Sequence, residues 1–392
     1  MLKRYKLTPQ SLTTIVVILI IIIGVPLLAW HTRTKKQNVS TSPRLVLADP
    51  SKGQFYLASA SGKQLNKYSS AKGNLLSWLA SDVNGDMLLS QGANPPGQEV
   101  LIVENGKLQH LSSAASQSLA KVLNDSGIYF VDQNSVLAVI CPDAKTDCAL
   151  DSINLVNGNK TTIMELGIKQ TTPPFLPVNL MGYSADDKTA YLWVNGHNKL
   201  GQLDNGIYQI DTSAKKVTAS YSVPAESAFS ARLSPDYQTL AYQQVGSGGK
   251  DTIHLLNLVS GKDKKVVYNL GGLPDSAINW SPDSSKLLIQ SQSVLLPASM
   301  SASPSPIKSV LVNALSGKAQ QIYQIADSRY DQLAYQGWLD SGSVIYQTKK
   351  TTTANDFNSA PAVTTVLNIS NQKASNLKVP AGDLIQVFQQ AN

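Results

Sequence analysis

The residue types that most often carry chemistry are few and scattered in this 392-residue sequence. Its histidines show no metal-ligand spacing; they are His31, His110, His197 and His254. Gly182-Tyr-Ser-Ala-Asp186 approaches the nucleophile elbow of a serine hydrolase but lacks the final glycine. Gly246-Ser-Gly-Gly-Lys-Asp251 departs from a phosphate-binding loop because it lacks the glycine-lysine-hydroxyl ending, and we interpret it as a hairpin loop. The sequence therefore predicts no catalytic residue, no metal site and no cofactor.

One aspartate-rich turn comes near to a calcium loop. Asp82-Val-Asn-Gly-Asp86 places oxygen ligands at the first, third and fifth positions, as such loops require. Met87 and Ala93 then stand where a glycine and a glutamate are expected. We interpret the segment as an ordinary aspartate turn, with calcium binding as the alternative.

The only two cysteines, Cys141 and Cys148, lie close together in a polar loop. A pair at this spacing is compatible with a disulfide that staples the loop, which needs an oxidising compartment. The alternative is two unrelated thiols in a reducing cytosol. We expect the disulfide.

The net charge of +7 invites a nucleic-acid partner, but its distribution does not support one. Residues 1–36 hold six of the 33 basic residues and no acidic residue, so the rest of the chain is nearly neutral. Binding to a duplex needs a concentrated basic surface that neutralises phosphates. We expect no nucleic-acid partner.

Residues 12–30 form an apolar run without an ionisable side chain. As a helix the run spans about 28 Å, close to the hydrocarbon core of a bilayer. It predicts an uncleaved transmembrane helix after a basic leader (1–11) and before a polar linker (31–43). A cleaved signal peptide is the alternative, although no small-x-small cleavage site follows. We expect a single-pass cell-membrane protein with a cytoplasmic N-terminus and residues 44–392 outside the cytoplasm.

Beyond the linker, short apolar runs alternate with two classes of turn. In all members but one, the first class has a glycine or asparagine where tight hairpins need a positive φ. It recurs every 44 to 56 residues, centred on Gly62, Gly106, Gly158, Ala214, Gly261, Gly317 and Asn371. The lysines beside these centres are interpreted as solvated turn positions. The second class carries aspartate and falls between them, as in Ser234-Pro-Asp236 and Ser281-Pro-Asp283.

Two hairpins in each period of about 50 residues give four strands, which is the plan of a propeller blade. Six periods are complete. A seventh blade needs Leu45–Ala48 and its following strands together with a C-terminal strand at Leu384–Phe388. The sequence therefore predicts an all-β, seven-bladed propeller over residues 44–392, closed by its two ends, with six blades as the alternative.

Some of the aspartate turns extend into a longer motif. Trp280-Ser-Pro-Asp-Ser-Ser-Lys-Leu-Leu288 resembles the repeat signature of TolB-like, WD40-like (PD40-type) propellers, and segments 232–242 and 182–191 are weaker copies. We expect the membrane anchor to stand in place of the α/β domain that precedes the propeller in TolB. The resemblance implies an extracytoplasmic, non-catalytic interaction platform.

In a four-stranded meander the B–C connections share one face, and here they are longer and more varied than the hairpins. Because loops on a rigid scaffold commonly carry function, we favour them for binding; the favoured residues are Asn195, His197, Asn205, Lys349 and Asp356. We expect a membrane-anchored scaffold for a protein, peptide or envelope glycan, and not an enzyme. The alternative is a propeller hydrolase or lyase with a site at the axial channel.

Overall fold

The computed structural model is described within the unit Ser42–Gln390. The described residues are 42–49, 52–69, 76–81, 86–91, 99–104, 107–119, 127–141, 147–169, 178–184, 186–201, 203–224, 231–245, 251–268, 276–291, 307–325, 331–350, 362–380 and 382–390. The transmembrane helix expected at residues 12–30 lies outside these ranges. Within them, no helix has the length and apolar character needed to cross a membrane.

The described chain forms seven four-stranded antiparallel sheets, the blades. Blade 1 holds β4 (Leu76–Ser81), β5 (Met87–Gln91), β6 (Glu99–Glu104) and β7 (Lys107–His110). Blade 2 holds β8 (Tyr129–Asp132), β9 (Ser135–Ile140), β10 (Asp147–Asn154) and β11 (Lys160–Lys169). Blade 3 holds β12 (Val178–Ser184), β13 (Thr189–Asn195), β14 (Asn205–Asp211) and β15 (Lys216–Ser222). Blade 4 holds β16 (Arg232–Leu233), β17 (Thr239–Val245), β18 (Asp251–Asn257) and β19 (Asp263–Tyr268).

The remaining blades follow the same plan, with one exception at the end of the chain. Blade 5 holds β20 (Ser276–Trp280), β21 (Lys286–Ser291), β22 (Ile307–Asn313) and β23 (Ala319–Ile325). Blade 6 holds β24 (Asp331–Asp340), β25 (Ser343–Lys350), β26 (Ala362–Asn368) and β27 (Ala374–Asn376). Blade 7 joins β28 (Asp383–Gln390) to β1 (Ser42–Asp49), β2 (Gln54–Ser59) and β3 (Gln64–Ser69). We call the four strands of each blade A to D in these orders.

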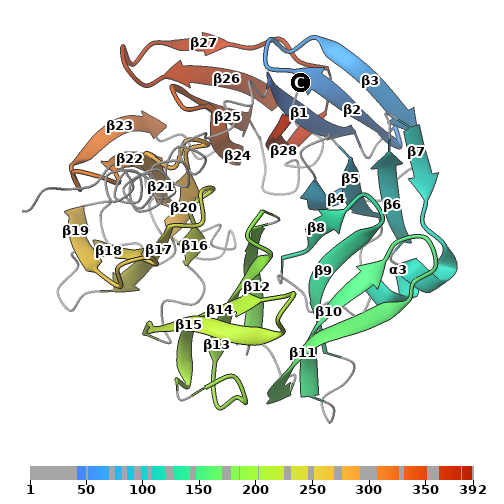
Figure 1. Ribbon diagram of the computed structural model, residues 1–392. Coiled ribbons are helices and arrows are strands. Elements are labelled where there is room, and N and C mark those ends of the chain that lie inside the picture. The colour runs from blue at the N-terminus through green and yellow to red at the C-terminus, as the bar shows by residue number, and fades with distance from the viewer. Residues whose placement is uncertain are drawn as a thin grey trace, which may run out of the picture. The chain divides into compact units, whose positions relative to one another are not determined.

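The A strands make a closed ring. In order they are β4, β8, β12, β16, β20, β24 and β28, and each contacts the next, with β28 contacting β4 again. Figure 1 shows the blades arranged around the centre that this ring encloses. The seven-bladed propeller predicted from the turn spacing is therefore confirmed, and the six-bladed alternative is wrong.

The hydrophobic core lies between neighbouring blades. Alternate residues of a strand point to opposite faces of its sheet, so each blade contributes to two interfaces. In β1, Leu45 and Leu47 pack against blade 6, whereas Val46 and Ala48 pack against blade 1. The described residues form seven such apolar clusters, one at each junction between blades. This burial on both faces of every sheet holds the ring together.

Blade 7 closes the ring with strands from the two ends of the chain, as the sequence predicts. The pairing of β1 with β28 is antiparallel and runs from Ser42 opposite Gln390 to Ala48 opposite Asp383. Both ends of the described chain therefore lie on the same side of the ring. Closure of this kind leaves no open junction between a first and a last blade.

The C–D hairpins of most blades reverse the chain with the same turn, in which the first residue's side chain accepts hydrogen bonds from the turn backbone. In blade 4, Asn257 Oδ1 accepts hydrogen bonds from the backbone N–H groups of Val259 and Ser260. Gly261 follows with φ +69°, a left-handed conformation that glycine adopts without strain. An asparagine at the first position and glycine near the tip thus reverse the chain within a few residues.

One short helix was not expected from the sequence. Helix α3 (Ser113–Leu119) lies between β7 and β8, and Ser112 Oγ accepts a hydrogen bond from Ala115 N–H at its start. Ser118 Oγ donates to Gly158 O, so α3 packs beside the C–D hairpin of blade 2. Seven residues are too few to produce a helical apolar period that could be recognised in the sequence.

Candidate binding face

The meander sends its connections to two opposite faces. The A–B and C–D turns share one, which we call the hairpin face, and the B–C and D–A connections share the other, which we call the loop face. Among the longer B–C connections, the structure describes most of the one in blade 3 (residues 196–204), whereas residues 92–98, 142–146, 246–250, 292–306 and 351–361 lie outside the described ranges.

The blade-3 loop starts and ends at a pair of asparagines. Asn195 closes β13 and Asn205 opens β14, and the two residues pair across the sheet. Gly196 N–H then donates to Asp204 O at 2.6 Å, which extends the ladder by one step. Gly196 has φ +114°, a conformation that residues with a side chain rarely adopt. The loop therefore has a narrow, hydrogen-bonded base.

Asn198 organises the interior of this loop. Its side chain is buried, and Nδ2 donates to Gly196 O at 3.1 Å and to Leu203 O at 2.8 Å. Its Oδ1 accepts from Leu200 N–H at 2.9 Å, and Tyr208 OH donates to Leu203 O at 2.6 Å. Buried polar groups are stable only when they are hydrogen-bonded, and these bonds meet that requirement within the loop itself. These hydrogen bonds fix the conformation of the described loop residues from within.

Lys199 fastens the loop to blade 2. Its N–H donates to Leu166 O at 3.0 Å, and its Nζ lies 2.9 Å from Asp147 Oδ2. The hydrogen bond and the charge of Asp147 raise the pKa of the Lys199 ammonium. Gly167 has φ +67°, and a Cβ at this position would lie 2.3 Å from Lys199 Cγ. A glycine is thus needed where the lysine stem crosses β11.

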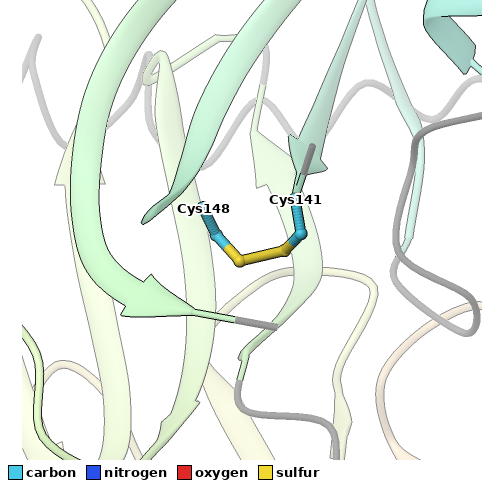
Figure 2. Close-up of a disulfide and its surroundings, with 2 residues drawn as sticks. All are labelled: Cys141 and Cys148. Atoms are coloured by element: carbon cyan, nitrogen blue, oxygen red, sulfur yellow. A yellow bond between two sulfur atoms is a disulfide. The ribbon is translucent and has the colours of Figure 1, made fainter. Parts of the chain in front are cut away.

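A disulfide lies next to this contact. The structure joins Cys141, which follows β9, to Cys148 in β10, with their Cα atoms 4.2 Å apart (Figure 2). Both residues are buried in the apolar cluster between blades 2 and 3, with Leu166 and Val178. The bond ties the two ends of the blade-2 B–C loop at the place where the blade-3 loop docks.

Besides Lys199, the blade-3 loop presents two ionisable groups to solvent. The side chains of His197 and Asp204 are 96% and 67% exposed, and Nδ1 of the histidine lies 3.4 Å from Oδ1 of the aspartate. The structure therefore brings together three of the residues favoured from the sequence, Asn195, His197 and Asn205. The sequence did not single out Asp204, Asn198 or Lys199, although all three lie in the same loop.

Lys349 was expected in an exposed loop, but the structure places it in a strand, where its side chain is buried. Strand β25 continues to Lys350, so Lys349 is a strand residue, and its side chain is only 1% exposed. Its Nζ lies 2.7 Å from the carboxylate of Asp383 at the start of β28. The lysine joins blade 6 to the closing strand. Asp356, also favoured from the sequence, lies outside the described residues.

Gln347, two residues earlier on β25, strengthens the same junction. It is fully buried, and its Nε2 donates to Thr364 Oγ1 and to Gly382 O, each at 3.2 Å. Its Oε1 accepts from Leu384 N–H at 2.8 Å. We call Gln347, Lys349 and Asp383 the closure bridge.

Blade 4 holds a polar cluster that the sequence did not reveal. Asp263 Oδ2 accepts a hydrogen bond from Tyr242 OH at 2.8 Å and lies 2.7 Å from His254 Nδ1. The tyrosine and histidine rings stack with centroids 4.9 Å apart. Burial, followed by the hydrogen bond to Asp263, raises the pKa of Tyr242. His254 Nε2 is buried, so the nitrogen that a substrate would have to reach is enclosed by protein.

Among the described residues, no three histidine, cysteine, aspartate or glutamate side chains lie close enough together to hold a metal ion. Asp82 and Asn84 of the alternative calcium loop lie outside those ranges. The other two described histidines, His110 in β7 and His197 in the blade-3 loop, belong to different blades from His254.

Known proteins resemble this chain in structure and not in sequence. No protein-family model matches the chain, and no curated protein matches it by sequence. Among solved structures, oligogalacturonate lyase from Vibrio parahaemolyticus is 13% identical with a TM-score of 0.51, over 84% of this chain and 88% of that one. TolB from Acinetobacter baumannii is 13% identical with a TM-score of 0.42, over 90% of this chain and 67% of that one. A putative TolB from Agrobacterium tumefaciens is 12% identical with a TM-score of 0.41, over 72% of this chain and 89% of that one.

At these identities the likeness shows the fold alone, and the chain is a seven-bladed β-propeller, the fold that the TolB-like repeat motifs indicated.

Proposed function

We propose that this protein is a membrane-anchored binding scaffold that holds a protein, peptide or envelope glycan on its loop face. In this proposal residues 12–30 span the cell membrane, the N-terminus is cytoplasmic and the propeller lies outside the cytoplasm. The observation that carries it is the conformation of the blade-3 loop, which is fixed from within by Asn198 and fastened to blade 2 by Lys199.

A loop that is ordered in advance favours binding for a thermodynamic reason. Ordering a flexible segment at an interface costs conformational entropy, and a segment that is already ordered avoids this cost. His197 and Asp204 stand exposed on that rigid base and offer one hydrogen-bond donor or acceptor site beside a carboxylate. Peptide amides and sugar hydroxyl groups are both complementary to such a pair.

Binding can be tested with the full chain in detergent, using an array of envelope glycans and a peptide library as probes. His197→Ala combined with Asp204→Ala should weaken capture of any bound probe at least tenfold without changing the melting temperature, because both side chains are exposed. Lys63→Ser, an exposed substitution on the hairpin face, is the matched control. Equal capture by the double variant and the parent would contradict a site at the blade-3 loop.

The enzyme alternative predicts a different result. The full chain should be incubated with oligogalacturonate, because a lyase forms a carbon–carbon double bond conjugated to the carboxylate that absorbs ultraviolet light. Catalytic growth of that absorbance would replace the scaffold proposal by a lyase.

The orientation has its own test. Protease added to intact spheroplasts should digest the propeller if it lies outside the cytoplasm. Protection of the propeller until the cells are lysed would contradict the orientation.

A further inference from the structure

Three C–D hairpins carry a large apolar side chain at their tip, in contact with solvent. Val156 in blade 2, Val259 in blade 4 and Leu315 in blade 5 are 67%, 78% and 92% exposed. Each residue stands two positions after the asparagine that starts its hairpin. Single exposed apolar residues are common, but the same hairpin position in three blades is a pattern that needs a reason.

The turn itself does not require an apolar residue there. Blades 3 and 6 have Ser213 and Ser370 at the same position, two residues after the first hairpin residue. The backbone N–H of either serine donates to the side chain of that first residue, at 2.9 and 3.1 Å, as Val156 N–H does at 3.0 Å. The apolar side chains gain little burial within the propeller, so an external contact explains them better than turn formation.

Each apolar tip is followed by an exposed lysine. These are Lys160, Lys262 and Lys318. Carboxylates near these positions have partners within the propeller. Asp236 and Asp283 of the A–B turns accept hydrogen bonds from serine hydroxyls of their own turns, Asp151 lies 3.4 Å from Lys160 Nζ, and Asp263, which follows Lys262, accepts a hydrogen bond from Tyr242 OH. Apolar tips beside lysines at the outer rim are complementary to a surface with anionic headgroups above an apolar interior.

The ends of the described chain point to the same surface. Ser42 starts a B strand and Gln390 ends an A strand, so both lie on the hairpin face with the C–D tips. Only residues 31–41 separate Ser42 from the expected transmembrane segment, and at full extension they span at most about 40 Å. The chain that comes from the proposed anchor therefore enters the propeller at the hairpin face.

We infer that the C–D hairpins of blades 2, 4 and 5 rest on the lipid bilayer, with Val156, Val259 and Leu315 inserted among headgroups and with Lys262 and Lys318 against lipid phosphates. This inference rests on the proposed anchor. A bilayer suits tips on three separate blades because it is an extended flat surface that all of them can reach together. The loop face then points away from the membrane, toward its ligand.

The test uses the full chain reconstituted in phosphatidylcholine–phosphatidylglycerol vesicles. With Cys141 and Cys148 bonded, an added cysteine is the free thiol for an environment-sensitive fluorophore. Labels at Leu315→Cys and Val259→Cys should shift their emission to shorter wavelength and be quenched by lipids that carry a spin label. Lys169→Cys, exposed at the loop-face end of β11, is the control and should remain as in water.

A second set of variants separates the tips from the tether. With the label at Lys318→Cys, the substitutions Val156→Ser, Val259→Ser and Leu315→Ser should return the emission toward that in water, because serine already occupies this position in blades 3 and 6. The vesicles are first floated on a density gradient. Floating protein whose label at Leu315→Cys stays water-like would overturn the inference while the anchor stands, and protein that does not float would overturn both. A blue shift without quenching by spin-labelled lipid would place the tips against protein, such as a second copy, and would also overturn it.

Discussion

Replacing Gln347 by leucine should weaken the propeller at its closure. The buried side chain makes three hydrogen bonds, to Thr364 Oγ1, to Gly382 O and from Leu384 N–H. Leucine has a similar volume and makes none of them. A net hydrogen bond contributes about 1 kcal/mol, and a buried group left without its partner costs about 1–3 kcal/mol. The free energy of unfolding should therefore fall by about 2–4 kcal/mol, since added apolar contact offsets part of the loss.

The assay has a global and a local readout. Denaturant titration of the full chain in detergent gives the change in stability, and hydrogen exchange followed by mass spectrometry gives the protection of the peptide that contains β28. We expect β28 amides to exchange faster in Gln347→Leu, whereas a peptide from blade 3 changes less. Thr364→Val is the matched control, because it removes only one of the three bonds and should cost about 1 kcal/mol or less.

The reasoning would be refuted by a change in stability below about 0.5 kcal/mol, which is within the range of ordinary surface substitutions, together with unchanged exchange in β28. That result would mean that strand pairing with β1 and apolar packing against blade 6 hold the closing strand without Gln347. A loss of protection spread evenly over all blades would show that closure is no weaker than the rest of the ring.

Three further predictions concern other parts of the molecule. Replacing Cys141 and Cys148 together by serine should lower stability by about 2 kcal/mol, and mass mapping of the native protein without reductant should find neither thiol free; two free thiols would contradict the bond. Asn198→Ala should cost about 1–3 kcal/mol and expose residues 196–204 to limited proteolysis, so an uncut loop would contradict its organising role. Burial opposes ionisation of Asp283, but hydrogen bonds from two serines of its turn outweigh it and lower its pKa. Its contribution is therefore present at neutral pH and lost as pH falls through the folded pKa, so Asp283→Asn should destabilise at pH 7 and progressively less in acid; a deficit independent of pH would contradict this.

The repeat plan could be predicted because each blade solves the same local problem. A chain reversal needs particular residues at particular places, and Asn257 with Gly261 shows how they act. The closing strand could also be predicted, because one strand was missing from the count and the apolar run at Leu384 was the remaining candidate. Turn chemistry and strand number are local properties, and the sequence displays them directly.

The closure bridge could not be predicted, because it depends on which distant segments meet. Lys349 stands beside Lys350 and a run of threonines, which suggests an exposed loop until Asp383 is placed next to it. The pairing of His254 with Asp263 likewise depends on the register between β18 and β19. Polar residues in a β-rich chain are ambiguous, because period-two alternation does not say which of them will find a buried partner.

The pairing of Ser42 with Gln390 also orders events during biosynthesis. Strand β1 cannot pair with β28 until the chain between them, from Asp49 to Asp383, has been made. Until then β1 offers an unpaired backbone edge, which is a template for mispairing with other chains. Contacts between such distant segments also slow folding, because a long loop must close first. The newly made chain is therefore most exposed to aggregation in the interval before residues 383–390 are made, and a chaperone that shields β1 would act in that interval.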